Sequence, residues 1–406
     1  MPKRKISAPV RPNVAARVAA LGFGGRDIPR PFVEDADFVA PNFHAGVEQD
    51  DAPQDYAEFA ADKNRNLVTA SRRTLVIVPV GVSLATRALA PHSLDGLALP
   101  AIADVASYLS AFTGLPTRIV AELPIENWTG GGRGRKAVAV RTSKSLVKVR
   151  VKKTDGEFQE TLEVSDILDA LLEELPKDAY AIVGLTPFDI CEDEAIIGGR
   201  AYGGSRIACL SYARYHPAFD DISRDWPLGL RAGTGGPITA AARAAAAALP
   251  RPSGTDLWLE RVITQVSSHE VGHCLGLDHC TMYNCWMGEN EGQAPYACPV
   301  CLRKLFDTTG AARGASDAGR AAFPAARTHY RALMNFCSSR LQVQKWAAMH
   351  AWCSGRLAQL EAVTEEEGAG GGAMSGANAT GATSGARAAS GATSGAGATG
   401  WTFPSE

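Results

Sequence analysis

The spacing of apolar residues along the chain predicts alternating strands and helices. Short runs rich in β-branched residues predict strands at 74–81, 118–123, 137–140, 146–151, 179–185 and 206–212. Apolar residues at helical spacing predict helices at 98–115, 166–175, 256–274 and 329–360. The first two strands and the helix between them form a βαβ unit, so we expect an α/β fold in which helices cover a sheet.

Composition sets both ends and one interior stretch apart from the rest. Residues 1–70 are rich in Pro, Asp, Ala and Asn without sustained periodicity, so we expect a loosely ordered N-terminal extension. Residues 71–362 hold the periodic segments and predict one domain, interrupted by an Ala/Gly/Arg-rich insert at 309–327 that we expect to be a surface loop. From 363 to 406 the chain is Gly, Ala, Ser and Thr-rich, which predicts a disordered tail.

Charge and hydropathy exclude some classes of protein. The 41 basic and 43 acidic residues leave a net charge of -2, which gives no overall attraction to nucleic acid or acidic membranes. No stretch approaches the ~18 apolar residues of a membrane span. No apolar segment follows the basic N-terminal residues, so we expect no secretory signal and a cytoplasmic location. The basic cluster at 2–5 leaves nuclear import as an alternative.

A histidine motif in the helix at 256–274 carries the strongest chemical signal. His269, Glu270 and His273 form H-E-x-x-H, in which the two histidines lie on one helix face and can reach one cation. Gly276 can end the helix in the left-handed conformation, which frees His279 to supply a third nitrogen. The alternative is a set of satisfied histidines on an amphipathic helix, but an extended motif of this length rarely arises by accident.

Four cysteines predict a second metal site. Cys280, Cys285, Cys298 and Cys301 are spaced C-x4-C-x12-C-x2-C, which suits a closed tetrahedral zinc site with four thiolates. Nine cysteines, an odd number, also favour a reducing compartment, where clustered cysteines bind metal more often than they pair. The alternatives are buried or redox cysteines, or a zinc ribbon that binds nucleic acid. The loop at 287–297 is acidic and has no basic residue, so we favour a structural clamp.

Met287 follows His279 by eight residues and lies between the two cysteine pairs. A lone methionine is normally core filler. Its position just past an extended zinc motif instead favours a Met-turn, the methionine-bearing turn below the zinc that defines the metzincin clan.

At these residues the sequence resembles the archaemetzincins. That family joins H-E-x-x-H-x-x-G-x-x-x-C to C-x4-C-x-M and then to C-x-x-C, followed by a Leu-Arg-Lys-Leu-like stretch, which here is 302–305. The resemblance implies a metzincin-like zincin fold: a mixed twisted sheet, an active-site helix bearing the histidines, and a C-terminal part stapled by the four-cysteine site. It therefore implies that 71–362 is a peptidase domain with two zinc ions, one catalytic and one structural. Only ten residues separate Met287 from Cys298, fewer than is usual in the family.

These residues predict the hydrolysis of peptide bonds. Three imidazoles leave one zinc position open for water, and Glu270 is placed to act as the general base. We expect a peptide or protein substrate and no nucleic acid or membrane partner, and the resemblance adds aminopeptidase-like action. The oxyanion donor is open, because the position that is tyrosine in some metzincins is Glu289. By the same analogy, the strand at 207–212 is a candidate edge of the substrate cleft.

Two rival functions remain. One is a non-catalytic scaffold stabilised by zinc, although no structural role requires a carboxylate at Glu270. The other is a zinc-ribbon interaction module with incidental histidines. The sequence does not predict an oligomeric state.

Overall fold

The computed structural model describes residues 12–39, 54–130, 137–152, 156–193, 195–219, 234–288, 293–310 and 318–370, without the side chains of 318–321 and 363–370. The chain forms two units, Met1–Val363 and Thr364–Glu406. The features below belong to the first unit, apart from the end of its last helix. The predicted disordered tail lies beyond residue 370 outside the described residues, and it stays a prediction.

A five-stranded sheet is built around the predicted βαβ unit. Its order is β10-β11-β7-β1-β2, with β1 Thr74–Pro79, β2 Thr117–Ile119, β7 Ala179–Thr186, β10 Gly199–Tyr202 and β11 Ile207–Ser211. β1, β2, β7 and β11 pair in parallel, and only β10 is antiparallel to its neighbour. α4 (Ile102–Thr113) connects β1 to β2 and packs against both, as the apolar pattern predicts.

The central strands are buried on both faces. Along β1, Leu75 and Ile77 join the larger hydrophobic core, whereas Val76 and Val78 join a second, smaller core. α5 (Val164–Glu174) supplies the smaller core with Ile167 and packs against strands of both sheets. Burial on both faces explains why these strands read as continuous apolar runs instead of alternating.

A second sheet was not predicted. Its order is β3-β4-β5-β6-β8-β9, with β3 Ile125–Asn127, β4 Ala137–Arg141, β5 Leu146–Lys152, β6 Thr161–Glu163, β8 Asp189–Glu192 and β9 Ala195–Ile197. Only β4 and β5 are long enough to show a pattern in the sequence. The others have three or four residues each, too few for periodicity to separate them from loops.

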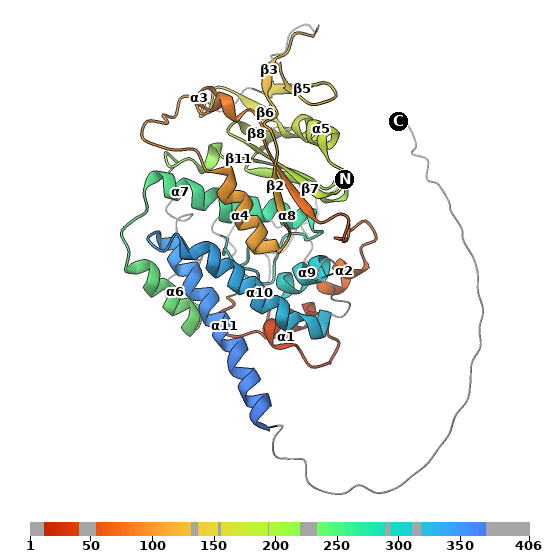
Figure 1. The fold of residues 1–406 in the computed structure, drawn as a ribbon, viewed down its shortest axis with the longest axis vertical. Helices are drawn as coiled ribbons and strands as arrows, with labels where there is room; N and C mark the ends of the chain where they lie inside the picture. Colours follow the sequence, from red (N-terminus) through yellow and green to blue (C-terminus); the bar gives the residue numbers. More distant parts are fainter. Residues whose placement is uncertain are drawn as a thin grey trace, which may run out of the picture. The chain divides into compact units, whose positions relative to one another are not determined.

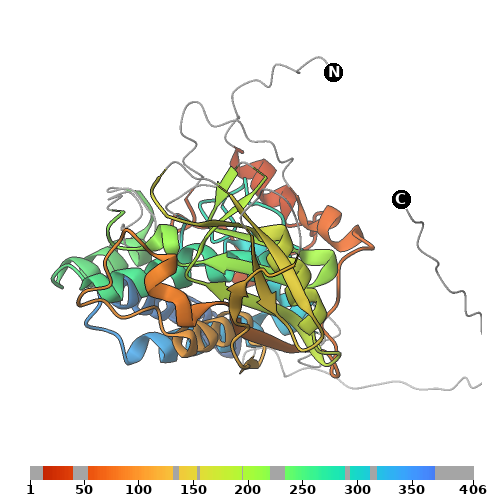
Figure 2. The same cartoon turned by 90° about the horizontal axis from the view of Figure 1, so that it is seen from above.

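Helices form most of the remaining structure. They are α1 Val14–Ala20, α2 Tyr56–Ala61, α3 Ala85–Ala88, α6 Pro237–Ala247, α7 Gly254–Arg261, a π-helix Val262–Ser267, α8 Ser268–Cys274, α9 Pro299–Gly310, α10 Ala318–Ser338 and α11 Gln344–Gly370. Single 3-10 turns lie at Arg30–Phe32, Val82–Leu84, Gly203–Ser205 and Ala213–Tyr215. α4 packs against both the sheet and α10. In Figure 1 the strands of the unit gather above α6, α10 and α11, and Figure 2 gives the view from the strand side.

The prediction of a surface loop at 309–327 is wrong at both ends of this range, which are helical. α9 continues to Gly310, and α10 begins at Ala318 and buries Ala322 and Ala326. Residues 311–317 lie outside the described residues. Alanine is the best helix former and needs little room at a helix contact, so an alanine-rich stretch reads as loop by composition but folds as helix.

The N-terminal stretch also differs from the prediction. In its described parts, residues 12–39 and 54–70, it forms α1 and α2 and buries Phe32, Phe38 and Phe59 in the main core. The Asp37 carboxylate accepts a hydrogen bond from the Thr239 N–H at 2.7 Å and so satisfies the first turn of α6. Each of these buried residues stands alone among polar ones, so the sequence shows no periodicity from which their burial could be predicted. The "loosely ordered" description therefore fails for these residues.

No helix in the described part of the chain is both long enough and apolar enough to cross a membrane.

Stability should depend on pH through His216. Its ring is buried, 4.7 Å from the Trp258 ring and 5.7 Å from His92. Burial lowers the pKa of His216 below 6.5, and the charges of His92 and Arg261 lower it further. The unfolded chain therefore binds the proton more readily, so stability should fall as pH drops below the unfolded value near 6.5.

Chemical unfolding of wild type and His216→Asn between about pH 5 and pH 8 checks this. Asparagine keeps an acceptor for the Ala218 N–H, which bonds His216 Nδ1 at 3.1 Å. The variant should lose less stability on acidification than wild type. Equal losses would show that His216 does not carry the effect.

Candidate active site and metal centres

One long helix carries the histidine motif. α7, the π-helix and α8 follow one another without a break, so the predicted helix at 256–274 is present. Ser253 caps its start by accepting the Asp256 N–H at 3.2 Å. At its end Gly276 has φ +88°, the left-handed conformation expected of a glycine in this position. The chain then turns back toward the helix with His279.

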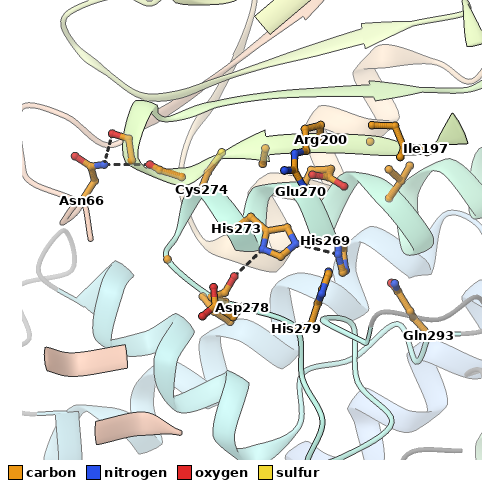
Figure 3. A pocket seen from close by; sticks show the side chains of 18 of the residues that line it. Asn66, Ile197, Arg200, His269, Glu270, His273, Cys274, Asp278, His279 and Gln293 are labelled. Carbon is orange, nitrogen blue, oxygen red and sulfur yellow. Dashed lines mark hydrogen bonds between the residues drawn. The ribbon is translucent and has the colours of Figure 1, made fainter. Parts of the chain in front are cut away.

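The structure brings the three predicted histidine ligands together. One nitrogen from each of His269, His273 and His279 lies within 4.8 Å of the other two. His269 Nε2 and His273 Nε2 are 3.1 Å apart. His269 is buried, and the other two are partly exposed toward a pocket (Figure 3).

Backbone carbonyls orient two of these rings. His269 Nδ1 lies 3.1 Å from the Trp286 carbonyl, and His273 Nδ1 lies 2.8 Å from the Leu277 carbonyl. A carbonyl only accepts, so both Nδ1 atoms carry the proton and both Nε2 atoms present lone pairs to each other. Burial and the neighbouring histidines hold the pKa of His269 well below its usual value, so that ring is neutral.

This donor set fits a metal ion. Two facing lone pairs 3.1 Å apart repel each other, and a cation between them removes the repulsion. Zinc bonds to imidazole nitrogen of ~2.0–2.1 Å in tetrahedral geometry place two nitrogens about 3.3 Å apart, close to the distance observed. The bonds from Nδ1 to carbonyls are also the usual outer-shell contacts of metal-binding histidines.

Glu270 lies beside the histidines and points toward the sheet. Its side chain is buried against the backbone of Gly199 at the start of β10, where an added Cβ would come within 2.7 Å of the carboxylate. Burial raises the pKa of Glu270 to about 8, and the nearby Arg200 opposes this rise. Figure 3 shows Arg200 and Glu270 on the same side of the pocket, above His273. A carboxylate with a raised pKa accepts a proton readily near neutral pH.

The predicted edge of the cleft is wrong by one strand. β11, the observed form of the strand predicted at 207–212, lies inside the sheet because β10 pairs with its outer side. The edge strand is β10, and its residues Gly199, Arg200 and Ala201 line the pocket. β10 is only four residues long and contains a glycine, so no strand pattern for it is visible in the sequence.

Met287 lies directly beneath the helix. It is fully buried, and a Cβ on Gly272 would meet its Sδ at 2.3 Å and the Trp286 ring at 2.8 Å. The Met287 carbonyl accepts the Cys280 N–H at 2.6 Å, which ties this turn to the residue after His279. Met287 is therefore in close contact with the helix that carries the histidines. Glu289 lies outside the described residues.

The four cysteines also come together. The sulfurs of Cys280, Cys285, Cys298 and Cys301 are buried and lie within 4.8 Å of one another. The Cys298 and Cys301 N–H groups point at the sulfurs of Cys285 and Cys298, both at 3.5 Å. Hydrogen bonds from the other three thiols hold the pKa of Cys280 well below its usual value, whereas burial raises that of Cys285. The four sulfurs therefore share protons through hydrogen bonds. A metal cation could take the place of these protons and bind the four sulfurs.

Comparison with known proteins finds similarity to one peptidase family. Residues 250–306 match the sequence model of peptidase family M54. The chain is 25% identical to archaemetzincin-2 of Macaca fascicularis over 277 residues. A 62-residue stretch is 41% identical to the archaemetzincin of Thermococcus kodakarensis.

The chain is similar to the archaemetzincins over part of its length. The match to the macaque protein covers 63% of this chain and 64% of that relative, so it spans less than two thirds of the relative's own length. The match to the Thermococcus protein covers 14% of this chain and 33% of that one.

One solved archaemetzincin, from Methanopyrus kandleri, aligns over 59% of this chain and 97% of its own, with a TM-score of 0.34 and 18% identity. A zinc-dependent peptidase from Methanocorpusculum labreanum aligns over 57% and 99%, with a TM-score of 0.29 and 16% identity.

A pocket of about 590 Å³ opens over the histidines. One wall is β10, and the floor is α8 with the turn that follows it. Another wall comes from the N-terminal segment and includes Asp62, Asn64, Arg65 and Asn66. Sequence reasoning missed this wall, because no metal-binding or catalytic residue type occurs there in a recognisable pattern. It also missed Gln265 and Gln293, which line the pocket near the histidines.

The side chain of Asn66 joins the two walls at one end of the pocket. Its Nδ2 donates to the carbonyls of Gly203 and Gly204, at 3.1 and 3.0 Å, just beyond the end of β10. Figure 3 shows this link at the opposite end from Ile197 and Gln293.

Gly272→Ala should disturb the histidine site. Alanine favours a helix by up to ~1 kcal/mol over glycine, but forcing a methyl group against Met287 and Trp286 costs about 1–3 kcal/mol. Because the Trp286 carbonyl orients His269, the variant should lose both stability and bound zinc. Thermal unfolding and metal analysis measure these effects. Gly204→Ala is the control, since its Cβ would meet nothing within 4 Å. A Gly272→Ala protein with wild-type stability and zinc would contradict the close contact.

Proposed function

We propose that this chain is a zinc-dependent peptidase whose metal is held by His269, His273 and His279. The observation that carries the proposal is the convergence of three histidine nitrogens beside a buried carboxylate, in a pocket walled by a sheet edge. The match of residues 250–306 to a peptidase family model and the similarity to archaemetzincin-2 support it independently. A second zinc at the four cysteines would be structural, since all four sulfurs are buried and leave no position for a substrate.

Glu270 is the general base of the proposed reaction. A zinc ion at the histidines would lower the pKa of a bound water toward neutrality and polarise the scissile carbonyl. Glu270 takes the proton from that water and delivers it to the leaving amine. Its position supports this role, because the Glu270 side chain lines the same pocket as the three histidines.

The substrate lies along β10 as an added strand. β10 is the outer strand of its sheet beside the pocket, and an edge strand offers free backbone groups to an extended peptide. Gly199 supports this, because the absence of a side chain there lets the backbone of β10 lie close to Glu270.

Glu270→Gln should separate turnover from metal binding. The variant removes the base but none of the three nitrogens, so it should keep wild-type zinc and lose about 10²- to 10⁴-fold in the rate of peptide cleavage. His273→Ala should lose zinc at this site as well as activity. Peptide-library digestion with parallel metal analysis measures both. A Glu270→Gln protein that cleaves at the wild-type rate would point to a contaminant or another site, and a wild type that binds zinc without cleaving any peptide would favour the scaffold alternative.

The shape of the pocket supports cleavage near the N-terminus of the substrate peptide. The Asn66 link closes one end of the pocket, where β10 ends, so a peptide along β10 can extend freely only the other way. If it pairs antiparallel, as β10 does with β11 and as gives the stronger ladder, its N-terminus points toward Asn66. We therefore propose that cleavage occurs close to the substrate's N-terminus.

Asn66→Ala should relax this restriction. In wild type, peptides with a free N-terminus should be cleaved faster than the same peptides carrying a long N-terminal extension. The variant should narrow that difference by about tenfold, as expected for losing ~1.4 kcal/mol of discrimination. Product mapping by mass spectrometry locates the cleaved bond. Asn66→Asp keeps the size of the side chain but cannot donate to the two carbonyls, so it should narrow the difference as Asn66→Ala does if the hydrogen bonds and not the bulk close this end. Wild-type cleavage at internal bonds of long peptides would refute the closed end.

A further inference from the structure

The turn between His273 and His279 determines the positions of both of these histidines. The carbonyl of Leu277 orients His273, and Asp278 is followed directly by His279. The turn leaves the helix at Gly276, whose N–H bonds the His273 carbonyl at 3.0 Å. Beyond the helix end, something else must hold the backbone of 276–278 in place if the histidines are to keep their positions.

The side chain of Gln54 makes that contact. Its Nε2 donates to the Gly276 carbonyl at 3.3 Å, and its Oε1 accepts the Asp278 N–H at 3.2 Å. One amide group therefore pairs with a carbonyl and an N–H two residues apart, as a neighbouring strand would. Both backbone groups lie past the end of α8, where helix carbonyls and the following N–H groups lack helical partners.

Lys304 fixes the orientation of this amide. Its ammonium group donates to Gln54 Oε1 at 2.8 Å and to the Gln54 backbone carbonyl at 2.6 Å. Lys304 is 2% exposed, so these two bonds replace most of the hydration of its charge. Flipping the amide would place its NH₂ group against both the ammonium and the Asp278 N–H. The observed orientation is therefore strongly preferred.

Arg65 holds the same turn from the other side. Its aliphatic stem packs on Gly276, where an added Cβ would come within 2.7 Å, and its guanidinium pairs with Asp307 at 2.8 Å. Asp307 lies three residues after Lys304 on α9, so one face of α9 anchors both contacts. The predicted Leu-Arg-Lys-Leu stretch thus has a physical role at its lysine.

We propose that Gln54, held by Lys304, is a positioning residue that sets the metal affinity of the three-histidine site. The proposal rests on the proposed function, in that it takes His269, His273 and His279 as metal ligands. Gln54 lies outside the family match at 250–306 and 222 residues before Gly276. Partners that orient metal ligands are typically worth 10- to 100-fold in metal affinity.

Cobalt binding to the full chain tests this directly. Co²⁺ at four thiolates gives intense sulfur charge-transfer absorption, which Co²⁺ at three imidazoles lacks, so the two sites can be titrated separately. Competition with a chelator then gives the affinity of each site. Gln54→Ala should lower Co²⁺ affinity at the histidines by about 10- to 100-fold and leave the cysteine site unchanged. Gln54→Glu keeps the acceptor for Asp278 and Lys304 but loses the donor to Gly276. Its Co²⁺ affinity at the histidines should therefore lie between those of wild type and Gln54→Ala.

The neighbouring residue provides the matched control. Asp55 caps α2 by accepting the Glu58 N–H at 2.8 Å, so Asp55→Ala loosens the same segment without removing the Gln54 amide. It should leave the histidine-site affinity as in wild type. Equal losses in Asp55→Ala and Gln54→Ala, or an unchanged affinity in Gln54→Ala, would overturn the proposal. If wild type binds Co²⁺ at the histidines but cleaves no peptide, the proposed peptidase function fails and the affinity comparison still decides this inference.

Discussion

Two imidazole nitrogens held 3.1 Å apart with their lone pairs facing each other are the constraint around which the rest of the site is arranged. Such a pair is unfavourable without a cation, so the fold must hold it in place. It does so by giving each ring a backbone carbonyl on its far side, Trp286 for His269 and Leu277 for His273. The two rings therefore keep their positions only as long as the turns that carry these two carbonyls keep theirs.

Each turn is secured by a different part of the chain. The turn at 286–287 is fixed from above by the Gly272 backbone and from the side by the cysteine cluster, through the bond from the Cys280 N–H to the Met287 carbonyl. The turn at 276–278 is fixed by Gln54 and Arg65 from the N-terminal segment. The first support is local in sequence and belongs to the family motif. The second joins residues that no motif connects.

This difference explains what the sequence could predict. The histidines, Glu270, Met287 and the cysteines lie within 33 positions, and their spacing encodes their geometry because a helix and two short turns leave few arrangements. The βαβ unit was also predictable, since its strands are buried on both faces. β10 was missed because four residues show no period, and Gln54 and Asn66 were missed because a single amide in a polar segment carries no pattern. Pairing over long sequence separations leaves no trace in local composition.

The 222-residue separation between Gln54 and Gly276 has a consequence for the order of assembly. Contacts between distant segments close large loops, so they form after the local helices and turns that they join. α9 supplies Lys304, which orients Gln54, and Asp307, which pairs with Arg65. A chain ending before α9 therefore holds all three histidines but lacks the two residues that hold Gln54 and Arg65 against their last turn. The supports of the turn at 276–278 are therefore complete only when residues from both ends of the folded domain have come together.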